Sequence, residues 1–537
     1  MKASHQNTVS FLIVSTIPLY AGAQSKGLDE QINDAFMPFA IWWESLIFTE
    51  INVLGVGIPI VLILLLFGAL LFSLYFGFIN VRHFFTAIQV VRGKFDSYEK
   101  LDLQPKTGDT SNTVHTNDSQ GEVNHFQALA TAVSGTVGLG NIAMVAVAIS
   151  IGGPGATFWM VVAGILGMSS KFVECTLGVK YRDIDANGNV HGGPMFYLSK
   201  GMAESGFAKL GKILAGVFAV LCVGASFGGG NAFQTNQAAA QIVGRFGLEG
   251  PASGSIIGVL FAIFVGIVII GGIKRIAKVT EKIVPLMAVL YVAAALFIIF
   301  SNIKLVDDAF SLIFTEAFSP RATIVGGFAG VLVQGLRRAA FSNEAGAGSA
   351  AIAHAAVNTR FPASEGLVGL LEPFIDTVVI CTMTALVIIM FNINGAFIYG
   401  DVANGLTLMS DGTRIGGVNL TSLAFENAIP GSSYLLVLAV TLFAFSTILS
   451  WSYYGLQAWK YLFGRGKLTD LLYKIIFLIF TVLGAAVTLD AVIKFSDAMI
   501  LALVFPNMIG LLFLFPKVRK ELKHYMAVIK KGPSTPT

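Results

Sequence analysis

The chain has 537 residues, of which 55% are hydrophobic and 12% are charged, about half the charged share of a soluble domain. Its mean hydropathy is +0.75, and its formal net charge is only +4. This composition argues against a soluble enzyme, a nucleic-acid-binding protein or a disordered scaffold, and predicts apolar helices packed in a lipid bilayer. The three cysteines all lie in apolar stretches, so we expect neither a disulfide framework nor a metal cluster.

The first residues, 1–23, have the features of a secretory signal peptide. Lys2 gives a positive start, Phe11–Leu19 is a short apolar core, and Ala21-Gly22-Ala23 matches a cleavage site. Because the core is too short to cross a bilayer, we predict cleavage before Gln24 and a mature chain that begins outside the cytoplasm.

Aromatic and acidic residues alternate along segment 24–52, which predicts an amphipathic helix on the outer membrane surface with Trp42 and Trp43 at headgroup level. Eleven later stretches are long enough to cross about 30 Å of hydrocarbon. They are approximately 53–78, 126–151, 156–179, 213–241, 254–273, 283–302, 322–340, 366–391, 432–459, 470–489 and 495–516.

The distribution of Lys and Arg between alternate loops predicts the orientation. One set of loops holds 27 of these residues and the other holds 6, and cytoplasmic loops carry the excess. The basic set is 79–125, 180–212, 272–282, 337–365, 460–474 and 517–537. We therefore predict a multi-pass protein of the bacterial inner (plasma) membrane, with the N-terminus outside and the tail 517–537 inside. The polar residues 104–123 are expected to form a flexible cytoplasmic linker.

One expected span, around Gln127–Met144, contains three glycines within six residues, Gly135, Gly138 and Gly140. Glycine destabilises a helix by about 1 kcal/mol relative to alanine, so this run favours local unwinding. Inside a bilayer, irregular backbone persists where it is buried in protein or lines a cavity, and it can then bind ions and carboxylates. Close helix packing through small residues is the alternative interpretation.

A second interruption is predicted at Gly326–Phe341, five spans after the first. Matching interruptions in two five-helix halves indicate an inverted-repeat transporter with a site at mid-membrane. The halves would be 126–302 and 322–516, preceded by the extra helix 53–78.

Other polar residues at membrane depth are candidates for the same site. Gln234 lies in an amide-rich run, and the hydroxyls of Ser446 and Thr447 suit sodium, which prefers oxygen ligands. Trp451, four residues after Thr447, would lie on the same helical face. The alternatives are bonding between helices for the amide and bonding to the preceding turn for the hydroxyls.

Few charged residues fall within the expected spans. Lys171 and Glu174, three residues apart, are expected to neutralise each other. Asp376 lies well inside a span, where it must be paired, protonated or coupled to an ion. Glu344 and His354 are expected to serve gating or structure. The sequence contains no phosphate-binding loop of the ATPase type and no zinc-protease HExxH motif.

The sequence resembles the alanine or glycine:cation symporter family, also called the sodium:alanine symporters. The resemblance is carried by strings that follow the family order from Phe126 to Gly455. They are FQALATAVSGTVGLGNIA, GGPGATFWM, KFVECTLGVKYR, GGPMFYL, IIGGIKRIAKV, FSNEAGAGSAAIAHAA, FIDTVVICTMTAL and FSTILSWSYYG. Ser450 departs from many members, which look to have glycine there.

The resemblance implies an all-α membrane fold like that of the bacterial leucine transporter, with about 11 transmembrane helices in a five-plus-five inverted repeat and one extra N-terminal helix. It also implies a substrate site and a sodium site on the unwound helix. The implied sodium ligands are Ser134, Val137, Ser446 and Thr447, with Asn141 near a second cation. The implied substrate residues are Gly135, Thr136, Gly138, Gly140, Gln234, Gly326, Gly330 and Trp451.

The predicted function is import of a small neutral amino acid, alanine or glycine, coupled to entry of co-transported sodium by alternating access. The protein is expected to be no enzyme, to use no organic cofactor and to have the lipid bilayer, rather than nucleic acid, as its surroundings. Proton coupling through Asp376 is the alternative mechanism, and a passive cation channel is a more distant one.

Overall fold

The computed structural model describes residues 26–53, 56–97, 121–321, 324 and 326–531. The expected signal peptide 1–23 and nearly all of the expected linker 104–123 lie outside the described residues, so both stay predictions. The described part is mainly helical, with three small β-sheets at its two ends.

The first described elements surround the helix that was expected to break. They are α1 (Leu28–Ile47), β1 (Glu50–Val53), β2 (Val56–Pro59), α2 (Ile60–Tyr75), α3 (Ile79–Arg82), α4 (Phe84–Val91), α6 (His125–Thr136), the 3₁₀ turn η1 (Leu139–Asn141), α7 (Ala143–Gly152) and α8 (Gly155–Lys180).

The middle of the chain begins with a short hairpin. Its elements are β3 (Asp183–Ile184), β4 (Val190–His191), α9 (Pro194–Phe196), the π-helical η2 (Tyr197–Gly201), α10 (Met202–Glu204), α11 (Ala208–Phe227), the π-helical η3 (Gly228–Ala232), α12 (Phe233–Phe246), α13 (Ser253–Ile269), α14 (Gly272–Ser301), the 3₁₀ turn η4 (Ile303–Leu305) and α15 (Val306–Phe318).

The remaining elements contain the second interrupted helix. They are α16 (Gly327–Asn343), α17 (Ala351–His354), α18 (Pro362–Gly369), α19 (Leu371–Pro373), the π-helical η5 (Phe374–Cys381), α20 (Thr382–Phe391), β5 (Phe397–Ala403), β6 (Leu406–Met409), β7 (Arg414–Ile415), α21 (Val418–Ala428), α22 (Ser432–Phe463), α23 (Lys467–Ala486), α24 (Leu489–Ala502) and α25 (Val504–Lys531).

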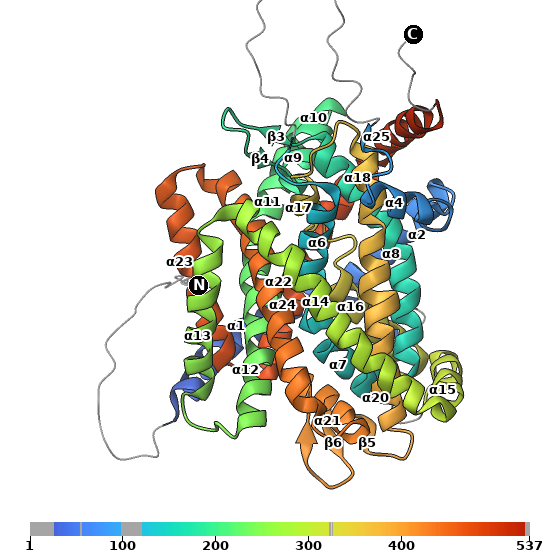
Figure 1. Ribbon diagram of the computed structural model, residues 1–537, viewed down its shortest axis with the longest axis vertical. Coiled ribbons are helices and arrows are strands. Elements are labelled where there is room, and N and C mark those ends of the chain that lie inside the picture. The colour runs from blue at the N-terminus through green and yellow to red at the C-terminus, as the bar shows by residue number, and fades with distance from the viewer. Residues whose placement is uncertain (1–25, 54–55, 98–120, 322–323, 325, 532–537) are drawn as a thin grey trace, which may run out of the picture.

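The long helices form two packed groups. In one group α8 packs against α16 and α18, and α7 packs against α16 and α20. In the other α11 and α12 pack against α22, and α13 packs against α23. Helix α14 contacts both α6 and α22, and Figure 1 shows the first group on the right and the second on the left.

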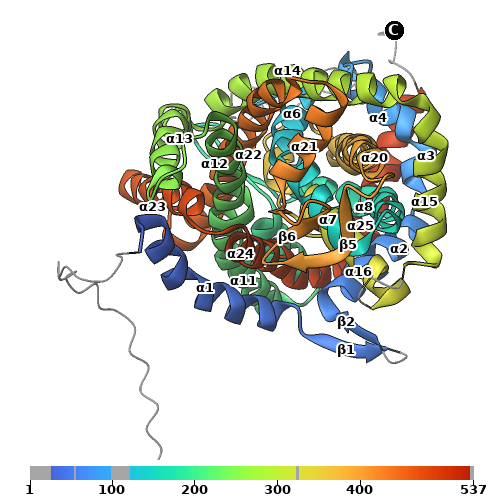
Figure 2. The same ribbon diagram turned by 90° about the horizontal axis from the view of Figure 1, so that it is seen from below.

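Seven described helices are long and apolar enough to cross a membrane, and the bent pair α6–α7 makes eight. Helices α2 and α13 are apolar but shorter. The prediction of a helical membrane protein is therefore confirmed, whereas the number of eleven spans stays a prediction. Helix α1 lies along the edge of the molecule beside α24 in the view of Figure 2, with Trp42 56% exposed.

The first interruption is where it was predicted. Helices α6 and α7 meet at an angle of 53°, and Val137 and Gly138 leave the helical conformation between them. The broken stretch is buried along its length, as irregular backbone in a membrane must be.

The second interruption is not where it was predicted. Helix α16 is continuous over Gly327–Asn343, and the chain leaves the helix at Glu344, whose φ is +54°. Gly346 and Gly348 also have positive φ, +94° and +85°, before α17 begins. Within α16, Gly335 serves packing instead, since a Cβ there would lie 2.6 Å from Cβ of Trp159 on α8.

Two predictions about charged residues are also corrected. Lys171 was predicted to pair with Glu174. Its Nζ atom instead lies 2.9 Å from a carboxylate oxygen of Glu372 on α19. Arg337 was counted in a cytoplasmic loop, but it lies in mid-helix and pairs with Glu44 of α1 at 2.7 Å. Moving Arg337 and Arg338 to the other set changes the two counts to 25 and 8, so the asymmetry keeps its sign.

Candidate functional site

The site is built around the bend between α6 and α7. Gly138 lies at its centre, where a Cβ atom would be 2.4 Å from Oγ1 of Thr447 and 2.9 Å from Oε1 of Gln234. Only glycine lets polar groups from α22 and α12 approach the backbone this closely. The glycine run therefore serves both to release the helix and to admit its neighbours.

Helix α22 contributes hydroxyl groups along the face that meets α6. Thr447 Oγ1 donates to the carbonyl of Ser134 at 2.9 Å, and Ser134 Oγ donates to the carbonyl of Ser446 at 2.7 Å. Ser450 Oγ donates to the carbonyl of Thr131 at 2.8 Å. The structure thus places Ser134, Ser446 and Thr447 together.

The two adjacent hydroxyls of α22 point to different partners. Ser446 Oγ donates to the carbonyl of Phe443 at 3.0 Å, which is the bond to the preceding turn that the sequence left open. Thr447 instead reaches across to the unwound helix. Its hydroxyl therefore contacts a backbone oxygen of α6 next to the bend.

Gln234 holds the other side of the break. Its Oε1 accepts from the backbone N–H of Leu139 at 2.9 Å, and its Nε2 donates to the carbonyl of Gly229 at 2.9 Å. Gly229 belongs to η3, where the α11–α12 helix is itself locally π-helical. Gln234 therefore joins two irregular backbone segments at the bend, and its predicted role in substrate binding stays a prediction.

Asn141 links the break to α19–α20. Its Oδ1 accepts from the N–H of Gly138 at 3.0 Å, and its Nδ2 donates to Oδ1 of Asp376 at 2.6 Å. Thr377 Oγ1 donates to the other carboxylate oxygen of Asp376 at 2.7 Å. Asn343 Nδ2 donates in turn to Thr377 at 2.8 Å. Asp376 is fully buried, and it brings a carboxylate to within one side chain of the broken helix.

Aromatic rings close the site. Trp451 is 1% exposed, its Nε1 donates to a carboxylate oxygen of Glu344 at 3.1 Å, and its ring meets Tyr454 edge-on at 5.3 Å. Gly230 makes room for this ring, since a Cβ there would lie 2.2 Å from Trp451 Cγ.

Two aromatic residues of the site were missed by sequence reasoning. A Cβ at Gly140 would be 3.4 Å from the Phe341 ring, and one at Gly135 would be 2.8 Å from the Tyr454 hydroxyl. Tyr454 follows Trp451 by three residues, so the shared helical face was a usable signal. Nothing local in the sequence marked Phe341, because its role depends on where α16 ends.

Gly326 and Gly330 lie at the start of α16. Gly330 precedes Phe341 by eleven residues, about 16 Å along a helix, and Phe341 is the residue of α16 that reaches Gly140. The position expected for the two glycines is therefore occupied by Phe341 and Ser342. Their substrate role stays a prediction without a supporting contact.

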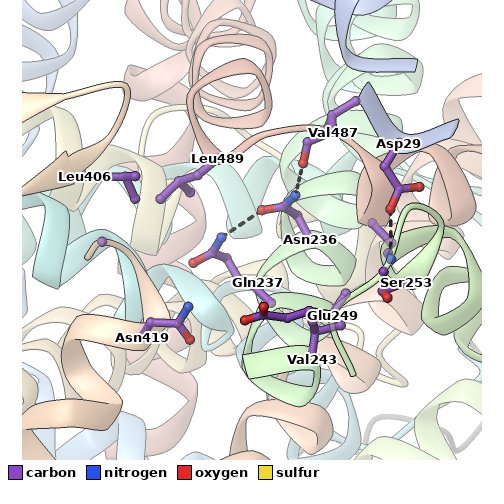
Figure 3. Close-up of a pocket in the computed structure, with 16 residues that line it drawn as sticks. Asp29, Asn236, Gln237, Val243, Glu249, Ser253, Leu406, Asn419, Val487 and Leu489 are labelled. Carbon is purple, nitrogen blue, oxygen red and sulfur yellow. Dashed lines mark hydrogen bonds between the residues drawn. The ribbon is translucent and has the colours of Figure 1, made fainter. Parts of the chain in front are cut away.

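A cavity of about 360 Å³, lined by both polar and apolar side chains, opens at the end of the molecule that carries β5–β7. Figure 3 shows Gln237, three residues after Gln234 on α12, directed into it beside Asn236 and Asn419. Gln237 Oε1 accepts from the N–H of Val418 at 2.9 Å, so one face of α12 connects the buried site with this cavity and with the start of α21.

Apolar helices interrupted at mid-length, with the freed backbone shared among polar groups of neighbouring helices, define a secondary active transporter. The profile of the sodium:alanine symporter family matches residues 42–537. The chain belongs to that family, which confirms the resemblance seen in the sequence and the expectation that the protein is a transporter and not an enzyme.

Individual relatives agree with this assignment. The sodium/alanine symporter AgcS of Methanococcus maripaludis is 40% identical over 412 residues, 77% of this chain and 86% of that protein. The probable sodium/glutamine symporter GlnT of Bacillus subtilis is 33% identical over 478 residues, 88% of this chain and 89% of that protein. Among solved structures, MhsT in complex with L-phenylalanine matches 74% of this chain and 99% of that chain, with a TM-score of 0.47 and 16% identity.

Proposed function

We propose that the protein imports a small neutral amino acid, alanine or glycine, together with sodium across the bacterial inner membrane. Membership of the sodium:alanine symporter family supports sodium coupling. The names of the relatives include both alanine and glutamine as substrates, so the size of the substrate is inferred from this chain's own site.

The proposed sodium site combines the carbonyl oxygens of Ser134 and Val137 with the hydroxyls of Ser446 and Thr447. The observation that carries the proposal is the 2.9 Å contact between the Thr447 hydroxyl and the Ser134 carbonyl. On ion binding this hydroxyl turns its oxygen toward the metal, and the carbonyl exchanges a hydrogen bond for a cation. Both groups are neutral, so the ion brings the only formal charge.

The proposed substrate site lies on the opposite side of the break. The N–H groups that open η1 and α7 are the positive end of a helix, which suits the substrate's carboxylate. Gly135, Thr136, Gly138 and Gly140 supply backbone close to the ligand, and Gln234 exchanges its bond to Leu139 for one to the substrate. Trp451, Phe341 and Tyr454 leave space for a short side chain.

A second cation is proposed at Asn141 and Asp376. The amide nitrogen of Asn141 and the hydroxyl of Thr377 each donate to the carboxylate of Asp376, and the amide oxygen of Asn141 accepts from Gly138. A sodium ion there would neutralise the buried carboxylate. A proton on Asp376 would do the same, which is the proton-coupled alternative.

One sodium ion per substrate is sufficient energetically. Entry of one charge releases about 2.3 kcal/mol at 100 mV, and a tenfold sodium gradient adds about 1.4 kcal/mol. The sum, about 3.7 kcal/mol, supports accumulation of several hundredfold.

The testing experiment is uptake of labelled alanine into proteoliposomes with an imposed inward sodium gradient. Saturable accumulation that requires sodium supports the proposal. Accumulation in sodium-free buffer that follows a pH gradient would favour the proton alternative, and cation conductance without any saturable alanine uptake would favour the channel.

A further inference from the structure

A second group of functional side chains lies apart from the broken helix. Five ionisable residues from α6, α8, α17, α18 and α19 form one continuous line of contacts, which we call the ion chain. Its members, in order, are His125, Glu365, His354, Glu372 and Lys171. The last four side chains are 0% exposed, and that of His125 is 8% exposed.

The contacts in the ion chain are short. His125 Nδ1 contacts Oε2 of Glu365, whose Oε1 lies 2.5 Å from Nδ1 of His354. The Nε2 atom of His354 lies 2.7 Å from Oε1 of Glu372, and Oε2 of Glu372 lies 2.9 Å from Nζ of Lys171.

Counting hydrogens assigns the charges. An ionised carboxylate only accepts hydrogen bonds, and a doubly protonated imidazole donates from both nitrogens. His354 faces a carboxylate oxygen through each ring nitrogen, so it satisfies both contacts as an imidazolium. Two cations, His354 and Lys171, then balance two anions, Glu365 and Glu372, while a neutral His125 donates to Glu365. With these charges the ion chain has no net charge, and it holds one proton more than it would if His354 were neutral.

The two ends of the ion chain lead in different directions. His125 is the first residue of α6 and lies at the end of the molecule that carries β3–β4, predicted to be cytoplasmic. Beside it the chain at Glu122 and Val123 is hydrogen-bonded to Ala356 and Asn358, before α18. At the other end Lys171 faces Glu174 and Glu344, and Glu344 accepts from Trp451 of the transport site.

Other polar groups surround the ion chain on each side. Cys175 of α8 faces His354, and Glu174 and Glu344 face Lys171. Arg182, just beyond α8, faces Glu365 and donates to the carbonyls of Ala355 and Thr359 at 2.8 and 2.9 Å. Burial lowers the pKa of Arg182 to about 10, which still leaves this guanidinium charged at neutral pH.

We propose that the ion chain is a proton-binding site, which holds one proton on His354 and exchanges it with the cytoplasm through Glu365, beside His125. On release the N–H bond at Nδ1 of His354 breaks and Oε1 of Glu365 accepts the proton. The carboxyl group of Glu365 then turns and gives this same proton to water at the end of the ion chain that His125 occupies, while His125 keeps the hydrogen that it donates. Glu365 and His125 end as they began, and His354 ends neutral.

Release of this proton acts on the start of α6. Without it the contact between Glu365 and His354 has no hydrogen, and the ion chain carries one uncompensated negative charge. A buried uncompensated charge is strongly destabilising, so the helices that meet there separate more easily. Because His125 begins α6, the broken helix is released at its cytoplasmic end as pH rises. A purely structural ion pair would give no such pH dependence in the working range.

The test rests on the proposed function for one readout and is independent of it for the other. The first readout is exchange of labelled for unlabelled alanine in proteoliposomes with saturating sodium and equal pH on both sides, from about pH 6 to about pH 9. Equal conditions on both sides make the result independent of protein orientation. The second readout is the melting temperature of the detergent-solubilised protein without substrate over the same pH range.

For the wild type we expect exchange to rise about tenfold with pH, the effect of losing one hydrogen bond between charged groups, and the melting temperature to fall. His354→Gln should flatten both profiles. Glu365→Gln should move both transitions to lower pH, because its amide can donate to the unprotonated Nδ1 of His354 and so favours the neutral ring. His83→Gln is the matched control, since His83 is a partly exposed histidine between α3 and α4, and it should keep the wild-type profiles.

Three results would overturn the proposal: flat wild-type profiles, a folded His354→Gln variant that keeps the wild-type slopes, or loss of the slopes in His83→Gln. If His354→Gln fails to fold, Glu365→Gln decides alone: transitions that stay at the wild-type pH would overturn the proposal, and transitions at lower pH would support it. If wild-type exchange is absent altogether, the proposed transport function fails, and the melting profiles still decide the proton site.

Discussion

The broken helix and the ion chain solve the problem of buried polar groups in opposite ways. At the bend, neutral hydroxyls, amides and carbonyls such as Thr447, Gln234 and Ser134 bond to one another. In the ion chain, full charges on residues such as His354 and Glu372 are paired. A neutral hydrogen bond contributes about 1 kcal/mol and can be exchanged for a ligand, whereas separating a buried ion pair costs several times more. The molecule therefore keeps its exchangeable contacts where cargo binds and its strongest contacts where helices must stay together.

The largest expected effect is a loss of stability at Lys171, the fully buried end of the ion chain. Lys171→Met leaves Oε2 of Glu372 without its ammonium partner, and removing one partner of a buried pair typically destabilises by about 3–5 kcal/mol. We expect little folded protein, measured as the yield and melting temperature of the monodisperse peak in size-exclusion chromatography.

The matched control is the double variant Lys171→Met/Glu372→Gln, which removes both charges and keeps an oxygen that accepts from His354. It should recover much of the lost stability, because it leaves no buried carboxylate without a cation. A single variant as stable as the wild type would contradict the view that this region is held by charge.

The second effect should be at the centre of the bend. Gly138→Ala places a Cβ 2.4 Å from the Thr447 hydroxyl and 2.9 Å from Gln234, and overpacking of this kind costs about 1–3 kcal/mol. We expect alanine uptake to fall at least about tenfold while the protein still folds, since Thr447 and Gln234 can move aside. Gly216→Ala is the control, because nothing lies within 4 Å of a Cβ there, and it should transport normally.

The first break could be predicted from the sequence because its signals are local. Three glycines in six residues, hydroxyls within an apolar helix, and an amide run each stand out against their own span. These patterns mark Ser134, Gln234 and Thr447 as polar residues at membrane depth. That the three belong to one site was implied by the family resemblance, because local patterns do not show which distant segments meet.

The second break could not be placed in this way, because glycine has two uses that look alike in sequence. Gly335 lets α16 approach α8 closely, whereas Gly346 and Gly348 adopt left-handed conformations that end the helix. Only the packing of α8 distinguishes them. The ion pair of Lys171 shows the same limit, since the local spacing to Glu174 suggested one partner and the fold supplied Glu372, 201 residues away.

The third-largest effect should be on the affinity for sodium. Thr447→Ala removes the hydroxyl that contacts the Ser134 carbonyl, and with it one proposed sodium ligand. Losing about 1–2 kcal/mol of the free energy of sodium binding should raise the sodium concentration for half-maximal alanine uptake roughly 5- to 30-fold. Thr447→Ser should restore most of the wild-type value. Unchanged sodium dependence in Thr447→Ala would remove this residue from the ion site.

The smallest effect should be one turn further along the same helix, at Ser450. Its hydroxyl makes the same kind of bond as that of Thr447, donating to a carbonyl of α6, Thr131, at 2.8 Å. Thr131, however, lies in the regular part of α6, where its carbonyl is not freed by the bend. Ser450→Ala should therefore lower stability by about 1 kcal/mol and leave the sodium dependence of uptake within about twofold of the wild type. Because the two variants remove equivalent hydroxyls from one helix face, a sodium shift in Ser450→Ala as large as that in Thr447→Ala would mean that α22 acts on the ion only by holding α6 in place.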